Sequence, residues 1–255
     1  MTRAPSTVVS GVAKRVIGIV LALSLIEVAV AQSGPRREAV QFAKGASSAV
    51  IKGRLKGDAD VDYVVRAAAG QTLSVTLRES NPQNYFNVLP PGSTGGAMFV
   101  GDTGEDYAGT LATDGDYVVR VYLMRPAARR GETSDYTVTI GVTGTPLTPL
   151  PASKDALVPG TSYHATAQVK CVPAYETATK DCDASVIRRG FDGTATVDIA
   201  GGAEVRSILF VKGKPVASSA SAIDTLSSER KGDITIVKLG ESERYEIPDA
   251  LLIGG

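Results

Sequence analysis

Three arginines lie close together near the middle of the chain, at Arg125, Arg129 and Arg130. Arginine bonds a carboxylate through two parallel N–H donors, so such a cluster is suited to binding an acidic surface. Pro126 and Gly131 lie within the same segment and predict a stiff, exposed loop. Because the segment contains no activated nucleophile, the pattern indicates binding rather than catalysis.

The same arginines also have a simpler interpretation. Glu132 and Asp135 follow them closely in the sequence. Exposed pairs of arginine and carboxylate are common on protein surfaces, and each contributes little to stability. The residue types alone leave both interpretations open.

The residues on either side of this loop predict the strands that hold it. Apolar and polar side chains alternate there with a period of two, which is typical of a strand with one buried face. The positions on the buried face are Tyr117, Val119, Val121 and Leu123 before the loop, and Tyr136, Val138 and Ile140 after it. We therefore expect a β-hairpin that presents the three arginines at its tip.

Little else in the chain offers catalytic or metal-binding chemistry. His164 is the sole histidine, and no serine or cysteine stands with it at a spacing typical of a nucleophile, so we expect it within a strand. A zinc site is disfavoured because only this histidine is available to assist the two cysteines. Asp181, Asp183 and Asp192 lack the alternating acidic ladder and closing glutamate of a calcium loop. We predict no metal, no cofactor and no enzymatic activity.

The N-terminal segment has the pattern of an export signal. Basic residues precede an apolar run over residues 16–26, and Ala29-Val30-Ala31 offers a cleavage site before Gln32. This predicts a signal peptide over residues 1–31 and a periplasmic mature protein. The apolar run is shorter than the roughly 20 residues that span a bilayer, so we expect no stable membrane span.

The overall charge argues against a nucleic-acid-binding protein. The predicted leader holds three basic residues and one acidic residue, so its removal takes the formal net charge from +0 to −2. Binding to a phosphate backbone requires a basic face, because its affinity comes largely from lysine and arginine contacts.

Short β-branched runs separated by glycine and proline predict an all-β protein. We expect an antiparallel β-sandwich over residues 32–144, a proline-rich linker over 145–155, and a small β domain over 156–255. Besides the hairpin, we predict strands over 40–44, 48–55, 61–67, 72–78, 97–100 and 107–111 in the first domain, and a further one within residues 81–92 that ends at Pro90 and Pro91. In the second we predict strands over 162–171, 183–188, 194–199, 205–211 and 234–239, and a last one from Glu243.

Both cysteines lie in the second predicted domain, at Cys171 and Cys182. In an exported chain their short separation indicates a local disulfide that closes the loop over residues 172–181. Closing a loop of this length stabilises a fold by about 2–3 kcal/mol.

Two blocks of the first domain resemble a known family. Residues 84–92 read Asn-Tyr-Phe-Asn-Val-Leu-Pro-Pro-Gly, and Gly115-Asp116-Tyr117 precedes the block over 120–132 that contains the arginines. Together they resemble the periplasmic inhibitors of g-type lysozyme. The resemblance implies a small β-sandwich that plugs the enzyme's substrate cleft and protects peptidoglycan. It also implies that Arg125, Arg129 and Tyr63 contact the enzyme, although Pro126 and the whole second domain depart from the family pattern.

These observations lead to one main functional prediction and one alternative. The first is inhibition of g-type lysozyme, with the arginine loop in an acidic, sugar-binding cleft and Tyr85 and Arg130 as further candidate contacts. The alternative is a carbohydrate or cell-wall binding module in which Tyr63, Tyr85 and Tyr122 stack on peptidoglycan or another glycan. Tyrosines in such positions are also common as packing residues.

Overall fold

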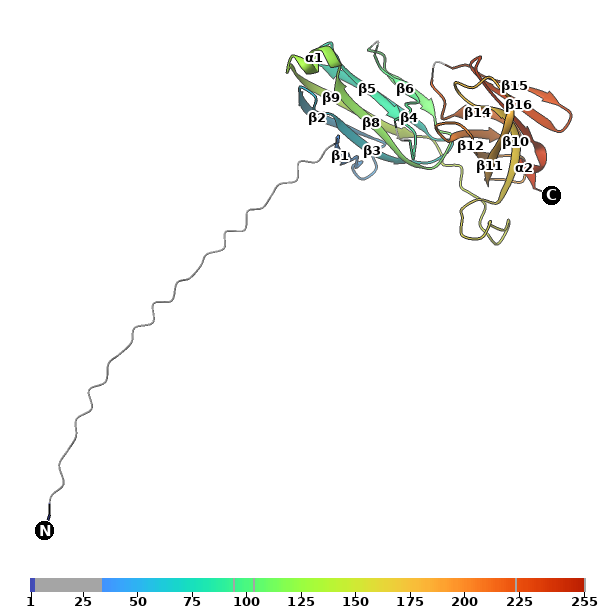
Figure 1. Cartoon of the computed structure of the whole chain (residues 1–255), viewed down its shortest axis with the longest axis horizontal. Coiled ribbons are helices and arrows are strands. Elements are labelled where there is room, and N and C mark those ends of the chain that lie inside the picture. The colour runs from blue at the N-terminus through green and yellow to red at the C-terminus, as the bar shows by residue number, and fades with distance from the viewer. Residues whose placement is uncertain (3–33, 94, 103, 223, 255) are drawn as a thin grey trace. The chain divides into compact units, whose positions relative to one another are not determined.

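The computed structural model describes residues 1–2, 34–93, 95–102, 104–222 and 224–254 (Figure 1). The predicted leader, residues 1–31, lies outside the described residues apart from Met1 and Thr2. The described chain is built of strands with two five-residue helices, which confirms the all-β prediction. From Gly34 onward the chain forms one compact unit.

The first half of this unit contains two sheets. Sheet I has the strand order β1 (Arg36–Ala39), β3 (Val61–Ala67), β8 (Gly115–Leu123), β5 (Asn84–Leu89) and β6 (Phe99–Val100). Sheet II has the order β2 (Ser48–Lys56), β9 (Thr133–Thr143), β4 (Thr72–Glu79) and β7 (Tyr107–Thr110). Neighbouring strands run antiparallel except for β1 and β3, which are parallel.

The two sheets share one hydrophobic core. Sheet I contributes Val119 and Val121, and sheet II contributes Val138 and Ile140, all of them fully buried. These are the apolar positions that the alternation of the predicted hairpin selects, so the burial of β8 and β9 is as predicted. Burial of large apolar side chains from both faces holds the sheets together, at about 1.5–3 kcal/mol for each fully buried side chain.

Three local predictions for this half are wrong. The expected β-hairpin does not form, because β8 lies in sheet I and β9 in sheet II, so the two strands do not pair with one another. Residues 40–44 form no strand; β1 precedes them, and the main chain pairs only as far as the bond from Val40 N–H to Val64 O. Val40 and Phe42 instead pack against the core from a loop, which explains their apolar character. The segment with the three arginines is also not a loop, because Arg125–Arg129 forms helix α1 between β8 and β9.

The second half forms one eight-stranded sheet, here called sheet III. Its order is β14 (Lys214–Ser218), β13 (Arg206–Val211), β12 (Ala195–Ala200), β11 (Lys180–Arg188), β10 (Ala165–Val172), β17 (Glu243–Pro248), β16 (Ile234–Leu239) and β15 (Leu226–Lys231). The two edge strands, β14 and β15, contact one another, so the sheet curls almost into a barrel around its own core. Helix α2 (Asp249–Ile253) follows the last strand.

The predicted disulfide is present in sheet III. Cys171 on β10 and Cys182 on β11 are bonded, with their Cα atoms 6.0 Å apart. Both side chains are buried in the core of the sheet. His164, expected within a strand, lies just before β10 and is buried. Its Nδ1 accepts a hydrogen bond from Arg188 N–H, so Nε2 carries the proton and donates to Leu150 O.

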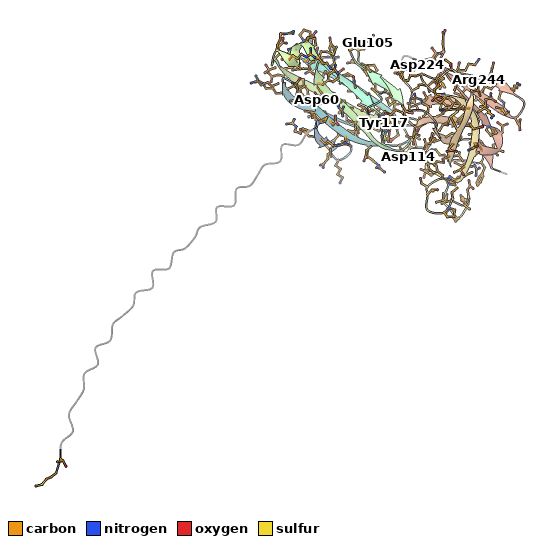
Figure 2. All side chains as sticks on the ribbon, in the orientation of Figure 1. Asp60, Glu105, Asp114, Tyr117, Asp224 and Arg244 are labelled. Carbon is orange, nitrogen blue, oxygen red and sulfur yellow. A yellow bond between two sulfur atoms is a disulfide. The ribbon has the colours of Figure 1, made fainter. Side chains whose placement is uncertain are left out.

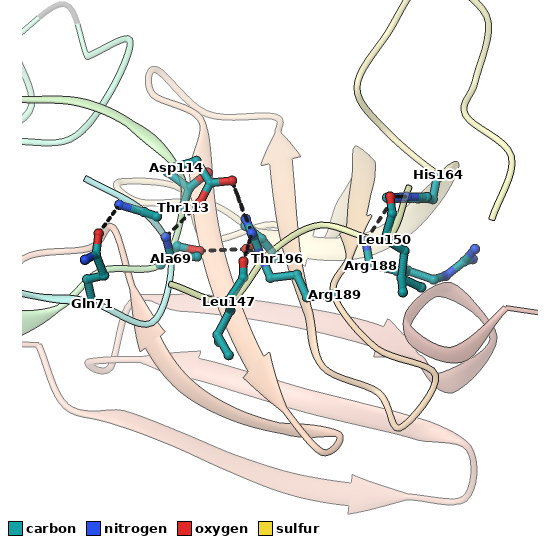
Figure 3. Close-up of polar contacts among 12 residues, drawn as sticks. Ala69, Gln71, Thr113, Asp114, Leu147, Leu150, His164, Arg188, Arg189 and Thr196 are labelled. Atoms are coloured by element: carbon teal, nitrogen blue, oxygen red, sulfur yellow. Dashed lines mark hydrogen bonds and ion pairs between the residues drawn. The ribbon is translucent and has the colours of Figure 1, made fainter. Parts of the chain in front are cut away.

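A buried polar junction joins the two halves (Figure 3). The guanidinium of Arg189 has no exposed side-chain surface and donates to Asp114, Thr196 Oγ1 and Leu147 O. Thr196 donates in turn to Ala112 O, at 2.8 Å. Asp114, labelled in Figure 2, also accepts a hydrogen bond from Ala69 N–H.

Small apolar side chains pack beside these bonds. Ala69 and Ala112 from the first half contact Leu209 and Ala217 from sheet III. The predicted linker contributes as well, because Leu147 N–H donates to Ala69 O and Leu150 N–H to Arg188 O. The segment is therefore held by main-chain hydrogen bonds to both halves. The domain boundaries at residues 144 and 156 stay predictions.

No helix in the described part of the chain is both long enough and apolar enough to cross a bilayer.

Candidate functional site

Helix α1 is the element that presents the arginines. Pro126 occupies its first turn, where a missing N–H costs nothing, and Gly131 follows its end with a φ of 68°, a conformation that glycine adopts without strain. Ala127 and Ala128 are buried and fix the inner side of the helix. Arg125 and Arg129 are four residues apart, so they lie on the same side of the helix, and both are exposed.

Hydrogen bonds anchor both ends of α1 to neighbouring loops. Met124 N–H donates to Gln83 O at 2.8 Å, just before the helix. Beyond its end, Glu132 O accepts a hydrogen bond from Gly57 N–H at 2.9 Å. A short helix on its own would not be stable in water, so these contacts and the buried alanines determine its conformation.

The three arginines differ in their partners. Arg130 Nε bonds Glu132 Oε1 at 2.6 Å. The hydrogen bond from Asn81 and, after it, the bond from Arg130 lower the pKa of the Glu132 carboxyl. The pair of Arg130 and Glu132 is the surface ion pair of the simpler interpretation. In contrast, the side chains of Arg125 and Arg129 have no hydrogen bond or ion pair with any described residue. Two of the three guanidiniums are thus available to an external carboxylate.

A pocket of about 440 Å³ opens beside α1. It is lined by Asp58, Asp60, Tyr122, Leu123, Met124, Arg125, Pro126 and Ala128. Partial burial raises the pKa of the Asp60 carboxyl, against the opposing attraction of Arg120. Asp60, labelled in Figure 2, was not predicted as a site residue, because nothing in the sequence distinguishes a single aspartate in a turn from other surface aspartates.

Tyr63 does not lie at this surface. Its side chain is 1% exposed and belongs to the core between sheets I and II. The Tyr63 and Tyr136 hydroxyls share a hydrogen bond of 2.7 Å, and burial raises the pKa of both phenols. A direct contact between Tyr63 and a partner protein does not fit this position, and Tyr63 instead supports β3 from inside.

Tyr85 and Tyr122 lie side by side on the outward face of sheet I. They are direct cross-strand partners on β5 and β8, and both are half-buried. Tyr122 donates a hydrogen bond to Asn87 Oδ1 at 3.1 Å. The next pair on the same face is Asn87 and Arg120. Arg120 bonds both carboxylate oxygens of the buried Asp62. Asn87, Arg120 and Asp62 were not singled out in the sequence, although the alternation places them on the same outward face.

Within the described residues, no group of three or more histidine, cysteine, aspartate or glutamate side chains is arranged to hold a metal ion.

Comparison with known proteins gives matches among solved structures alone. No family model matches the chain, and no curated protein matches it. The chain is similar to the crystal structure of PliG from Aeromonas hydrophila, a periplasmic lysozyme inhibitor of g-type lysozyme, at 35% identity. That match covers 42% of this chain and 96% of the other, with a TM-score of 0.41.

Two further structures of such inhibitors match in the same way. A mutant of the Escherichia coli protein is 28% identical and the Salmonella Typhimurium protein is 26% identical. Each match covers 43% of this chain and 100% of the other, with a TM-score of 0.35. All three matches leave more than half of this chain unmatched.

Proposed function

We propose that the half of the chain with sheets I and II inhibits a g-type lysozyme, and that α1 enters the substrate cleft of the enzyme. The observation that carries this proposal is the pair of exposed, unpaired guanidiniums of Arg125 and Arg129 on one side of a fixed helix. Lysozymes cut glycosides with carboxyl groups in a sugar-binding cleft, so their cleft offers the acceptors that this pair lacks.

The proposal that the target is a g-type lysozyme rests on resemblance to known inhibitors rather than on the geometry of α1. The motifs over residues 84–92 and 115–132 resemble inhibitors of g-type lysozyme, and the Aeromonas hydrophila inhibitor is 35% identical over 96% of its length. The matched 42% of 255 residues is about 107 residues, close to the 108 residues from the start of β1 at 36 to the end of β9 at 143. We take this half as the matched part.

The structure of α1 suggests how the arginines would bind. Because the helix is anchored at both ends and buries its alanines, little main-chain freedom is lost when a partner binds. A bidentate arginine–carboxylate bond in a cleft that excludes water is much stronger than the same bond at an open surface. Arg130 would contribute less to binding, since its ion pair with Glu132 must first be broken. Tyr85 would lie at the border of the contact.

The predicted leader and the periplasmic location of the similar inhibitors support a site of action in the periplasm. There the protein would protect peptidoglycan from an incoming lysozyme. A wall-binding module without inhibitory activity is the alternative, and the same assay separates the two.

The test is a titration of the mature protein, residues 32–255, against a g-type lysozyme acting on a peptidoglycan suspension. Arg125→Ala and Arg129→Ala should each weaken inhibition by about 2–4 kcal/mol, or roughly 30- to 1,000-fold, if each arginine meets a desolvated carboxylate. Arg→Lys at either position should recover only part, because an ammonium cannot form the bidentate bond. Melting temperatures should stay unchanged, since both side chains are exposed.

Arg130→Ala is the matched control, because it removes the same side chain one position from Arg129 but from an existing ion pair. We expect it to change inhibition less than about threefold. If the double variant Arg125→Ala/Arg129→Ala inhibits as well as the unmodified protein, α1 has no part in the mechanism. If the unmodified protein binds peptidoglycan and leaves the enzyme active, the wall-binding alternative is correct.

A further inference from the structure

We infer that the outward face of sheet I beside α1 binds an uncharged glycan, a chain of N-acetylated pyranose sugars of the kind found in peptidoglycan. The proposed surface, here called the tyrosine face, consists of Tyr85 and Asn87 on β5 and Arg120 and Tyr122 on β8. It concerns a ligand other than the lysozyme and does not depend on inhibition.

The register of the strands brings these four side chains together. Tyr85 lies directly opposite Tyr122, and Asn87 lies directly opposite Arg120. Directly opposed side chains on one face have Cβ atoms about 5 Å apart, so the two tyrosines start from neighbouring points on this face. The intervening residues, Phe86 and Val121 among them, point into the core, which leaves the four polar and aromatic side chains on the outside.

Hydrogen bonds fix the polar groups of the tyrosine face, and two of these groups keep N–H donors that have no partner. The Tyr122 hydroxyl donates to Asn87 Oδ1, which turns the amide so that its Nδ2 hydrogens are available. Arg120 uses Nε and Nη2 to bond Asp62, at 2.7 and 3.0 Å. In the described chain, neither Asn87 Nδ2 nor Arg120 Nη1 has a hydrogen-bond partner. Preorganised donors lose little freedom when they meet a ligand oxygen.

The charge of this face favours a neutral ligand over an anion. Arg120 is its only basic group among the four residues, and it is neutralised by the buried Asp62, whose side chain is 3% exposed. Aromatic rings pack on apolar ring faces, while amide and guanidinium N–H groups bond hydroxyl and carbonyl oxygens. A pyranose with an acetamido group presents both kinds of surface. Two neighbouring rings suit two consecutive sugars of a chain better than one isolated sugar.

The adjoining pocket extends the surface toward α1. Tyr122 forms part of both the tyrosine face and the pocket of about 440 Å³ that contains Asp60. Ligand sites typically combine a concave region lined by aromatic groups with a few fixed polar groups, and this region of the protein has both. The carboxylate of Asp60 provides an acceptor for sugar hydroxyls at the end of the face.

The experiment measures binding of the mature chain to a hexamer of N-acetylglucosamine by calorimetry, and to purified peptidoglycan by sedimentation. Tyr85→Ala and Tyr122→Ala should each weaken binding to both probes by about tenfold. Tyr122→Phe keeps the ring but frees the Asn87 amide, so it should have a smaller effect. Tyr175→Ala is the matched control, because Tyr175 is 99% exposed in the loop between β10 and β11, far along the chain.

Each alternative result has a defined meaning. Absence of binding by the unmodified protein, equal binding by all variants, or an equal loss in Tyr175→Ala would each overturn the inference. So would binding to peptidoglycan that disappears between about 50 and 500 mM salt, since that result marks an attraction between charges. Complex formation with lysozyme, measured without glycan, should persist in Tyr122→Ala, so failure of the glycan site and failure of the inhibitor proposal are distinguishable.

Discussion

Replacing Arg189 with alanine should destabilise the protein far more than replacing an exposed arginine. The side chain of Arg189 is fully buried, and both Nη1 and Nη2 lie 3.1 Å from Asp114 Oδ2. Removing one partner of a buried ion pair costs about 3–5 kcal/mol, because the other charge stays behind without compensation. Asp114 keeps the bond from Ala69 N–H and is one-third exposed, so we expect the lower end, about 3 kcal/mol.

Arg66→Ala is the control for this measurement. Arg66 pairs with Asp116 at the same distance of 3.1 Å, but the two side chains are 77% and 54% exposed. An exposed pair contributes about 0–1 kcal/mol, because water screens the attraction and the side chains lose freedom. The two variants therefore remove the same kind of ion pair and differ in burial.

Thermal unfolding followed by far-ultraviolet circular dichroism provides the assay. For a folded unit of this size, 1 kcal/mol corresponds to about 2–4 °C, so Arg189→Ala should lower the melting temperature by about 6–12 °C. Arg66→Ala should lower it by less than about 4 °C. Equal shifts in the two variants would refute the reasoning that burial of the junction determines its contribution.

Three further predictions follow from other parts of the fold. Reducing the disulfide should lower the free energy of unfolding by about 2–3 kcal/mol; two reactive thiols before any reductant is added would contradict the bond. Gly201→Ala should cost about 1–3 kcal/mol, because the new Cβ would collide with Cys182 Sγ, whereas Gly34→Ala meets nothing within 4 Å and serves as the control. Burial raises the pKa of Tyr107 and Tyr163 to about 12. An unfolded tyrosine ionises near pH 10, so the stability that these two protonated tyrosines contribute is complete below about pH 10 and is lost toward pH 12. A midpoint of urea unfolding that does not fall between these pH values would contradict this prediction.

Regular alternation in the sequence was sufficient to predict much of the fold. The buried face of β8 follows directly from the spacing of Tyr117, Val119 and Val121, because a strand repeats every two residues. The same rule places Tyr63 between Val61 and Val65 on an inward face. The family resemblance implied that Tyr63 contacts the enzyme, whereas the periodicity places its side chain in the core, where the structure has it.

Features that depend on distant contacts were not predictable in this way. Helix α1 has too few residues for a helical period, and its conformation depends on loops at Gln83 and Gly57. Strand β15 has a polar sequence and forms because β16 offers it an unpaired edge. The difference between Arg130 and the unpaired arginines requires coordinates, since Arg129 stands next to Arg130 in the sequence and yet makes no ion pair with Glu132.

The junction around Arg189 also makes the first half of the chain dependent on the second. Sheets I and II share one hydrophobic core and sheet III has its own, and the junction lies between them. In this chain, Ala69 and Ala112 are covered by Leu209 and Ala217, and Asp114 depends on a guanidinium 75 residues away. Deleting the second half would uncover an apolar patch and leave the partly exposed carboxylate of Asp114 without its guanidinium partner. A chain cut after sheets I and II would therefore lose stability even where sheet III has no separate activity.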